Sequence, residues 1–324
     1  MSANLYEIKE SKEFYENNYN EGYMDKWPKT KQKRVLELVR SLPLPKHGII
    51  LDYGCGNGIF TDVLKQALPN FEVYGCDISE NAIKNATKRF PDCHFFVLEQ
   101  ENPKNIKADF IFSHHVLEHV YNMKQSLAEM NGYMKDNAFA LHILPCRNRE
   151  SFTHKICTLR TDGINQEMEN RYYFEYVGHV RRLSPEELNK LMAAHNFVAE
   201  QQLYGNHFWG LMKWVSQYSP RYILLFTDTK KCINFKAKVN MLLLRVLLFF
   251  LMFLQLPVLV RNYIEMFTKN KSIQKLTLIL NFIPFLLSYP FYWLINYLDR
   301  YEWKVKRNQK SGSEMYIFYK RTKK

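Results

Sequence analysis

The chain has few cysteines, and their spacing does not suggest a stapled fold. Six cysteines are spread over 324 residues, and no two of them form a Cys-x-x-Cys pair. This spacing excludes a disulfide scaffold and a zinc ribbon, so we expect reduced thiols in a cytosolic compartment. The first twenty residues lack an apolar core, and we therefore expect no secretory signal. The chain also has no internal repeat, which excludes a repeat array.

Acidic residues are scarce in the last third of the chain. From Gly205 to Lys324 there are 20 Lys and Arg but only 5 Asp and Glu, while the whole chain carries a net charge of +13. The remainder is therefore slightly acidic, and all the excess positive charge lies beside the most apolar segments. This pairing favours an anionic membrane surface over nucleic acid as a partner. An RNA platform is also disfavoured because the basic segments carry no interleaved aromatic stacking pattern.

A glycine-rich stretch follows the first apolar segment. The residues from Ile49 to Leu51 predict a short buried strand that Asp52 closes, and a helix is predicted to follow. Three glycines alternate between them: Gly54, Gly56 and Gly58. Glycines let the backbone turn tightly and let a ligand approach, and amides at the start of the helix can face that ligand. Alone, the stretch fits either a ligand-binding loop or a turn without a ligand.

Apolar runs alternate with helical patterns beyond this loop. Further strands are predicted at 71–76, 94–98, 109–113, 138–144 and 197–204. Helices are predicted up to about residue 68, at 79–89 and at 184–195. The last of these begins with Ser184, Pro185 and Glu187, which form a capping box with proline at the first position. The alternation predicts an α/β fold with a doubly wound, mostly parallel sheet.

The N-terminal segment is predicted to be helical over residues 5–42. It carries several aromatic residues, among them Tyr15, Tyr19 and Trp27, and Pro43 ends it. We take residues 1–45 as an arm that packs against the fold or covers a ligand as a lid.

An acidic residue ends the second predicted strand. Asp77 lies about twenty residues after the glycines, where a carboxylate can accept hydrogen bonds from both hydroxyls of a ribose.

Four segments together resemble class I S-adenosylmethionine-dependent methyltransferases. They are Leu51–Gly58, Asp77, Val116–Val120 and His179–Pro185. The resemblance spans about residues 30–205 and implies a seven-stranded Rossmann-like domain over 46–205 with S-adenosylmethionine as its cofactor. The spacing G-x-G-x-G also differs from the dinucleotide spacing G-x-G-x-x-G and favours the methyl donor over NAD. The resemblance implies that the cofactor site is formed by Asp52, Gly54, Gly56, Gly58, Asp77, Ile78, Glu99, Gln100, Ser113 and His114.

Histidines surround a glutamate after the fourth predicted strand. If Val116 opens a helix, His115, Glu118 and His119 lie at i, i+3 and i+4 on one face, which suits a metal ion. The same letters read H-x-x-E-H, the inverted zinc-peptidase motif, although the surrounding methyltransferase frame disfavours that activity. Without a metal, His115 or His119 would be the general base, since an imidazole titrates near neutral pH.

This segment is also similar to the E-x-x-E-H of ubiquinone-pathway O-methyltransferases and small-RNA 2′-O-methyltransferases. Those families bind a divalent ion through this motif and a later histidine. Here His115 replaces the first glutamate, Glu118 and His119 match, and His179 is the candidate for the later histidine. Imidazole in place of a carboxylate makes Mg²⁺ less suitable and a softer ion more suitable. The segment therefore predicts either a divalent-metal site or a structural Glu–His pair.

Two apolar runs follow the sixth predicted strand. Met241–Val260 is interrupted only by Arg245, Gln255 and Pro257, and the second run extends over Leu276–Leu298. Each run reaches the roughly 20 residues that a bilayer crossing requires. The alternative is a pair of buried helices in a soluble domain.

The segment Glu314–Lys320 reads as a strand. The resemblance implies that it is the final, antiparallel strand of the sheet, with residues 313–324 completing the domain. Residues 206–312 would then be an inserted helical hairpin that returns the chain to the side it left. The turn 261–275 and both flanks of the hairpin are basic, which favours a monotopic or re-entrant hairpin over two spans.

These features predict a membrane-associated methyltransferase with its catalytic domain on the cytoplasmic side. We expect O-methylation of a lipid-linked or amphipathic acceptor, such as a quinone precursor, a lipid-linked glycan or a lipid headgroup. The alternatives are an RNA O-methyltransferase and a non-catalytic, membrane-anchored protein that binds S-adenosylmethionine.

Overall fold

A computed structural model describes residues 12–17, 19, 27–98, 105–268 and 271–322 of the chain. The chain forms two compact units. The first comprises Met1–Pro145, Leu183–Gln202 and Met315–Lys324, and the second comprises Cys146–Arg182 and Leu203–Glu314. The segment from Cys146 to Arg182 thus belongs to the second unit, whereas we expected it within the 46–205 domain.

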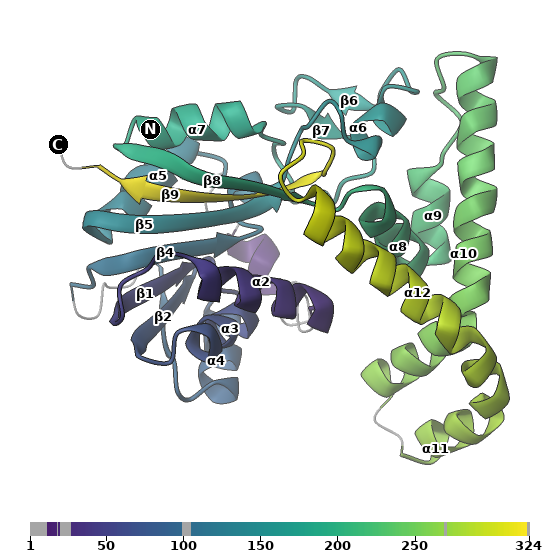
Figure 1. The fold of residues 1–324 in the computed structure, drawn as a ribbon, viewed down its shortest axis with the longest axis horizontal. Coiled ribbons are helices and arrows are strands. Elements are labelled where there is room, and N and C mark those ends of the chain that lie inside the picture. Colours follow the sequence, from purple (N-terminus) through teal and green to yellow (C-terminus); the bar gives the residue numbers. More distant parts are fainter. Residues whose placement is uncertain (1–11, 18, 20–26, 99–104, 269–270, 323–324) are drawn as a thin grey trace. The chain divides into compact units, whose positions relative to one another are not determined.

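The first unit is built on a seven-stranded sheet in the order β3-β2-β1-β4-β5-β9-β8. Strands β1 to β5 all pair in parallel, as the alternation of strands and helices predicts. They are β1 (Gly48–Tyr53), β2 (Phe71–Asp77), β3 (His94–Val97), β4 (Ala108–His114) and β5 (Met134–Pro145). The strand order reverses between β1 and β4, and ligands of open α/β sheets bind at the carboxyl ends of the strands beside such a point. Figure 1 shows these strands side by side.

The last strand enters this sheet between two earlier ones. β9 (Glu314–Arg321) lies between β5 and β8 (Phe197–Gly205). The amide of Thr322 donates to Asn196 before β8, and the amide of Ser313 donates to Asn206 after it, at 2.8 and 3.3 Å. β9 therefore runs antiparallel to β8. The prediction of a seven-stranded, mostly parallel sheet whose last strand closes after a long insertion is confirmed.

Helices cover both faces of this sheet. Consecutive residues of β1 point to opposite faces, so Asp52 meets Thr61 of α3 while Tyr53 meets Glu129 of α5. The helices of this unit are α2 (Lys29–Ser41), α3 (Ile59–Ala67), α4 (Glu80–Arg89), α5 (Met123–Gly132) and α7 (Pro185–Ala193). The Ser184–Glu187 capping box of α7 is confirmed. The sequence analysis missed α5, whose apolar pattern is weak.

The N-terminal arm is not one continuous helix. The expectation of a helix over 5–42 falls partly on residues outside those described, namely 1–11, 18 and 20–26. Residues 12–17 are helical, but Trp27 and Pro28 are not, and α2 begins only at Lys29. Proline fixes its own backbone angle and disfavours helical geometry in the residue before it, which explains the break.

The second unit is mainly helical. Its elements are α6 (Phe152–Cys157), the short strands β6 (Ile164–Asn165) and β7 (Arg171–Tyr172), α8 (Phe208–Tyr218), α9 (Pro220–Phe226), α10 (Phe235–Phe267), α11 (Lys271–Leu280) and α12 (Phe282–Lys306). The first apolar run lies within α10. The second run is broken, because α11 and α12 meet at an angle of 78°. By length and composition, α10 could cross a membrane alone and the bent pair could do so only together.

Arg182, from the segment that resembles a methyltransferase motif, is a structural anchor of the second unit. Its guanidinium is buried, forms an ion pair with Glu175 and donates to the carbonyls of Cys146 and Ser313. It also lies 4.1 Å over the ring of Tyr172. Although burial acts to raise the pKa of Glu175, Arg182 lowers that pKa below its ordinary value.

Replacing Arg182 by methionine should destabilise the protein by about 3 kcal/mol or more, because Glu175 is left as a buried charge without its guanidinium. The double variant Arg182→Met, Glu175→Gln should recover part of that loss. Urea unfolding measures both values, and Arg149→Met on the exposed surface is the matched control. A loss below about 1 kcal/mol for Arg182→Met would contradict the anchoring role.

Candidate functional site

The glycine loop between β1 and α3 has a left-handed backbone. Gly54, Gly56 and Gly58 have φ values of 76°, 51° and 78°. A Cβ on Gly54 would lie 2.5 Å from a methyl carbon of Val116, so this position also needs glycine for space. The amides of Gly54 and Cys55 donate to the carbonyl of Cys76 at the end of β2. The loop is thereby fixed across the carboxyl ends of two neighbouring strands.

Asp77 holds the loop from the end of β2. One carboxylate oxygen accepts from the amide of Gly56 at 2.9 Å, and the other accepts from the amide of Ser79 at 3.0 Å. Burial raises its pKa, while these amide hydrogen bonds act to lower it. A carboxylate has about four acceptor sites, so Asp77 can also accept from a ligand's hydroxyls.

Asp52 is buried at the end of β1. The hydroxyl of Thr61 donates to its carboxylate at 2.6 Å. Burial raises the pKa of Asp52 to about 7, the hydrogen bond from Thr61 opposes that rise, and the charge of Asp77 adds to it. At neutral pH this carboxyl is therefore close to half ionised, and a cationic ligand beside it would favour the ionised form.

Two adjoining cavities open at this edge of the sheet. The smaller, about 60 Å³, is lined by Asp52, the loop and His114, and the larger, about 190 Å³, is lined by Asp77 and Ile78. They share the following residues: Tyr15, Tyr19, Gly54, His115 and His119. Most of the room for a ligand thus lies beside the predicted ribose carboxylate.

The N-terminal arm lies over these cavities. The hydroxyl of Tyr19 is 2.7 Å from where a Cβ on Gly56 would be. The carboxylate of Glu16 accepts from the first amides of α4, and from the side-chain amide of Asn81 at 2.6 Å. A carboxylate at a helix N-terminus is stabilised by the unpaired amides and the helix dipole. The described part of the arm therefore covers the site, as the lid alternative requires.

The histidine segment does not form the expected α-helical face. Leu117–His119 is a single 3₁₀ turn, and His115 before it has a left-handed backbone with φ of 56°. Nδ1 of His115 nevertheless lies 2.9 Å from a carboxylate oxygen of Glu118, which is buried. A zinc-peptidase helix needs both histidines on one α-helical face, so this local geometry does not fit that activity.

The Nδ1 atoms of His115 and His119 have partners within the first unit. Nδ1 of His115 faces Glu118, and Nδ1 of His119 lies 2.7 Å from the hydroxyl of Tyr15. His179 lies in the second unit, where it pairs with Glu175 at 3.3 Å. The proposed metal set of His115, Glu118, His119 and His179 therefore stays a prediction.

The remaining predicted cofactor residues differ in their positions. His114 is buried in the wall of the smaller cavity, with its ring 4.0 Å from that of Phe60. Ser113 is not among the residues that line the two cavities, and its hydroxyl lies 2.7 Å from Nδ1 of His142. Burial lowers the pKa of His142 to about 4, so this partner is neutral.

Gly58, which was predicted to bind the cofactor, packs against α4 and β3. A Cβ on Gly58 would press on Ala86, Phe90 and Phe95 at 3.0 Å, so this glycine serves the packing of α4. Glu99 and Gln100 lie outside the described residues.

Sequence reasoning missed much of the larger cavity. It is also lined by Tyr53, Tyr121, Asn122, Gln125, Ser126 and Glu129. The hydroxyl of Tyr53 donates to Glu129 at 3.1 Å. The available signal was Asn122, which caps α5 by accepting from the amide of Gln125 and marks the helix start.

Comparison with known proteins agrees with this geometry. A family model described as "Methyltransferase domain" matches residues 26–202. This match covers more than half of the chain, which therefore belongs to that family, the class I S-adenosylmethionine-dependent methyltransferases.

Individual relatives are distant. Trans-aconitate 2-methyltransferase from Variovorax paradoxus is 25% identical over 141 residues, which are 43% of this chain and 54% of that protein. Malonyl-[acyl-carrier protein] O-methyltransferase 2 from Ilyobacter polytropus is 30% identical over 97 residues, which are 28% of this chain and 37% of the relative. The matches thus span about half or less of these relatives. The structure of magnesium protoporphyrin IX methyltransferase from Synechocystis PCC 6803 with bound SAH is similar over 59% of this chain and 90% of that one, with 17% identity and a TM-score of 0.42.

Donor binding should depend on pH through Asp52. Because a cationic donor favours the ionised carboxyl, whose pKa is about 7, affinity for S-adenosylmethionine should rise about tenfold between pH 6 and pH 8. Asp52→Asn should remove this pH dependence of the affinity. The donor's own titration affects both proteins equally, so it cancels when their affinities are compared at each pH. Calorimetry at several pH values measures it, with the exposed Asp92→Asn as the control. An unchanged pH dependence in Asp52→Asn would show that Asp52 is not coupled to the donor.

Proposed function

We propose that this protein transfers a methyl group from S-adenosylmethionine to an oxygen atom of a lipid-linked or amphipathic acceptor at a membrane. The observation that carries the methyl transfer is the cavity that joins the glycine loop and Asp77 to the His115–Glu118 pair. The apolar exterior of α10 to α12 supports a membrane-borne acceptor.

The residues of the cavity fit the donor. Asp77 and the left-handed loop offer a carboxylate and close backbone access, and Asp52 offers a carboxyl that a cation would ionise. When bound, the donor supplies an electrophilic methyl group on a sulfonium. The chain's own contribution is to hold the acceptor in line, to exclude water beneath the arm and to accept the acceptor's proton.

His115 is the better placed candidate for the general base. It lines both cavities, and its Nδ1 lies 2.9 Å from a carboxylate oxygen of the buried Glu118. A buried carboxylate beside an imidazole orients the ring and stabilises its protonated form. His119 lines the same cavities, but its Nδ1 faces Tyr15 of the arm. We therefore assign His119 a role in holding the arm closed.

The second unit and one of the relatives support this acceptor class. A soluble substrate gives no reason for a 33-residue apolar helix within the same chain. The malonyl relative is named as an O-methyltransferase, which agrees with oxygen as the acceptor atom. A quinone precursor, a lipid-linked glycan and a lipid headgroup all combine an oxygen nucleophile with an apolar anchor. The positive charge beside the apolar segments favours the anionic, cytoplasmic leaflet.

Removing the proposed base should slow the chemical step without weakening donor binding. His115→Ala should lower kcat by about 10²- to 10³-fold while the Kd for S-adenosylmethionine changes little. Glu118→Gln should shift the acid limb of the kcat profile to lower pH, because the carboxylate that stabilises the protonated imidazole is lost. The exposed His94→Ala is the control.

Two outcomes would overturn this assignment. If His119→Ala abolished turnover while His115→Ala retained it, the base would be His119. If both variants kept full activity, the acceptor would be a group that is already ionised, such as a carboxylate, and would need no base.

The identity of the acceptor is tested by incubating the full chain with methyl-labelled donor and a membrane lipid extract. We expect label in a lipid-soluble product that is stable when the protein is removed. Label in added tRNA or small RNA instead would favour the alternative of an RNA O-methyltransferase. Donor binding that depends on Asp77 without any labelled product would favour a non-catalytic role.

A further inference from the structure

Helix α12 has the opposite burial pattern to an amphipathic helix of a soluble protein. Its buried residues are mostly polar: Ser288, Ile295, Asn296, Asp299 and Glu302. Its exposed residues are mostly large and apolar, and they include Phe282, Ile283, Leu286, Leu287, Phe291, Trp293 and Leu294. Ile283 and Leu287 are 68% and 70% exposed. An amphipathic helix of a soluble protein buries its apolar stripe, so this exposed apolar surface would be unfavourable in water.

The two inward carboxylates of α12 have partners in α8. Asp299 accepts from Lys213 at 2.9 Å, and Glu302 accepts from the backbone amide of Trp209 at 2.6 Å. Lys306 also donates to Glu302. Ionisable residues of membrane-embedded helices likewise face the interior of the bundle and pair there. The pairing fixes which face of α12 looks outward.

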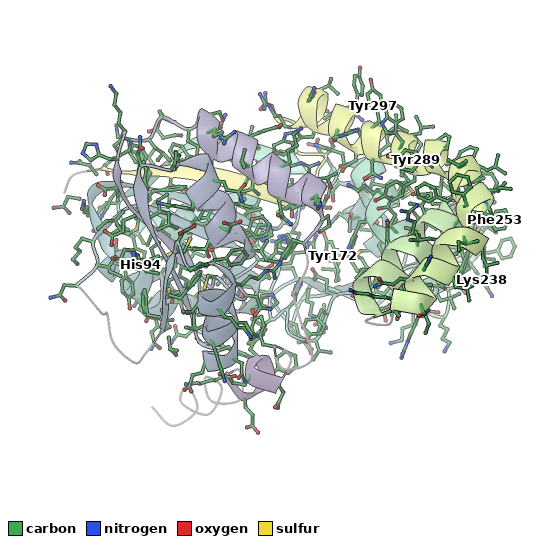
Figure 2. The ribbon with its side chains drawn as sticks, turned by 90° about the horizontal axis from the view of Figure 1, so that it is seen from below. His94, Tyr172, Lys238, Phe253, Tyr289 and Tyr297 are labelled. Atoms are coloured by element: carbon green, nitrogen blue, oxygen red, sulfur yellow. The ribbon has the colours of Figure 1, made fainter. Side chains whose placement is uncertain are left out.

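Helix α10 shows the same orientation. Its inward stripe joins the core of the second unit through Met241, Leu244, Leu248 and Met252. Its outward stripe contains Leu243, Val246, Phe250 and Phe253, which are 56 to 70% exposed. Figure 2 shows Phe253 pointing away from the helices.

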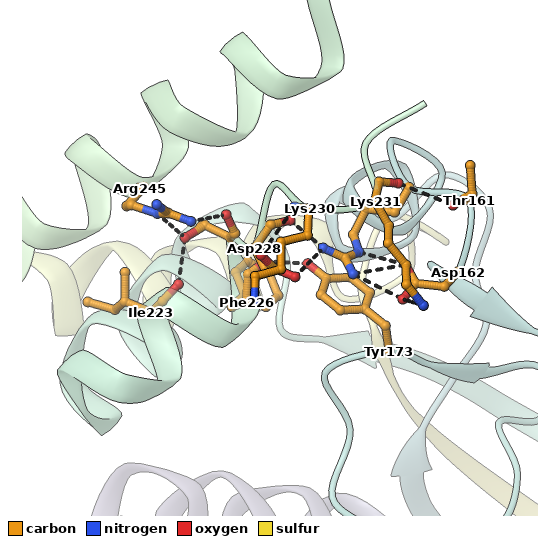
Figure 3. A network of polar contacts seen from close by, with 11 residues as sticks. Thr161, Asp162, Tyr173, Ile223, Phe226, Asp228, Lys230, Lys231 and Arg245 are labelled. Carbon is orange, nitrogen blue, oxygen red and sulfur yellow. Dashed lines mark hydrogen bonds and ion pairs between the residues drawn. The ribbon is translucent and has the colours of Figure 1, made fainter. Parts of the chain in front are cut away.

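The polar residues in the apolar run of α10 also turn inward. Arg245 is the one charged residue from 239 to 260, and it donates to the hydroxyl and the carbonyl of Thr227 at the end of α9. Gln255 is buried against Gln217 of α8 at 2.8 Å. Figure 3 shows Arg245 directed at this end of α9.

The exposed face of α12 changes character along the helix. It begins with Phe, Ile and Leu, and residues 282–298 contain no charge. An aromatic ladder follows at four-residue spacing, in which the rings of Trp293, Tyr297 and Tyr301 lie 5.2 and 6.3 Å apart. Exposed basic residues then take over at Arg300, Lys304, Arg307 and Lys310. This is the order of hydrocarbon, interface and anionic headgroups in a membrane.

We propose that the outward faces of α10, α11 and α12 insert into one leaflet of an anionic bilayer, with the aromatic ladder at headgroup level. The flanking charges decide between lipid and a second copy of this chain. Among the residues of α10 to α12 whose exposure the structure describes, the exposed charges are basic: Lys236, Lys238, Lys271, Lys275, Arg300 and Lys304. Two such surfaces would repel each other, whereas anionic lipid would attract them.

Two features favour insertion into a single leaflet over a crossing. The ten residues of α11 are about 15 Å long, half of the hydrocarbon thickness, and α12 turns away from it by 78°. The first half of α10 packs against α9 and the segment 152–174. That segment holds the network of Arg160 with Asp162 and Asp228. A crossing α10 would draw these charges towards hydrocarbon (Figure 3).

This lipid-binding surface extends the proposed function, and only the membrane-borne acceptor rests on that function. Lipid binding is therefore measured separately from methyl transfer. The full chain is mixed with vesicles of phosphatidylcholine containing about one third phosphatidylserine, and with vesicles of phosphatidylcholine alone. Binding should be stronger to the anionic vesicles and should weaken with salt. Phe253→Glu and Leu287→Glu should each weaken it about tenfold or more. Val198→Glu, at an exposed apolar residue of the first unit, should not.

Cysteine labelling distinguishes one leaflet from a crossing. Lys275→Cys in α11 and Lys304→Cys near the end of α12 are each reacted with a membrane-impermeant thiol reagent added outside the vesicles. Single-leaflet insertion predicts that both react. Protection of Lys275→Cys while Lys304→Cys reacts would overturn the proposal in favour of two spans. Failure to bind anionic vesicles, together with a concentration-dependent dimer, would overturn it in favour of a second copy, even if methyl transfer persisted.

Discussion

The hydrogen bond from the amide of Gly56 to Asp77 is the constraint on which the first unit depends. The loop has three left-handed glycines, and the carboxylate at the end of β2 holds the middle one through its amide. This link ties the carboxyl ends of β1 and β2 together at the place where the strand order reverses. The buried Asp52 lies beside it, and the mutual repulsion of the two carboxyls contributes to the raised pKa of Asp52. A cationic ligand offsets that repulsion, so the arrangement of the two carboxyls favours the methyl donor.

The first unit and helix α12 of the second unit follow opposite rules of burial. In the first, apolar residues fill the space between sheet and helices, and the polar groups gather at one edge. In the second, α12 turns Asp299 and Glu302 inward and exposes Phe, Leu and Ile. Buried charges must be paired, and the lysine and backbone amide supplied by α8 meet that need. Exposed apolar side chains must be covered, and a lipid leaflet provides that cover over a whole helix face. Under the proposed function, the first unit binds a water-soluble methyl donor and the second unit brings the chain to a membrane-borne acceptor.

The sequence predicted the parts of the fold that depend on local pattern. The apolar runs gave the parallel strands, the alternating glycines gave the loop, and Ser184 with Glu187 gave the cap of α7. At two places distant residues decide the local geometry. His115 adopts a left-handed conformation and its side chain contacts Glu118 across a 3₁₀ turn, so the expected helical face does not form. Ser113 is not among the residues that line the two cavities, and its hydroxyl lies beside Nδ1 of His142 in β5.

The sequence by itself determined that the chain belongs to a methyltransferase fold and carries a basic, apolar insertion, since both follow from residue types at fixed spacing. Only the tertiary structure decided which face of each apolar helix looks outward. Hydrophobic periodicity cannot show this for α12, because its polar residues are few and their partners, Lys213 and the amide of Trp209, lie more than eighty positions away in the chain. The same holds for the site, where Tyr15 meets His119 across 104 residues. Contacts between residues so far apart in the chain are set by the packing of whole elements and leave no local pattern in the sequence.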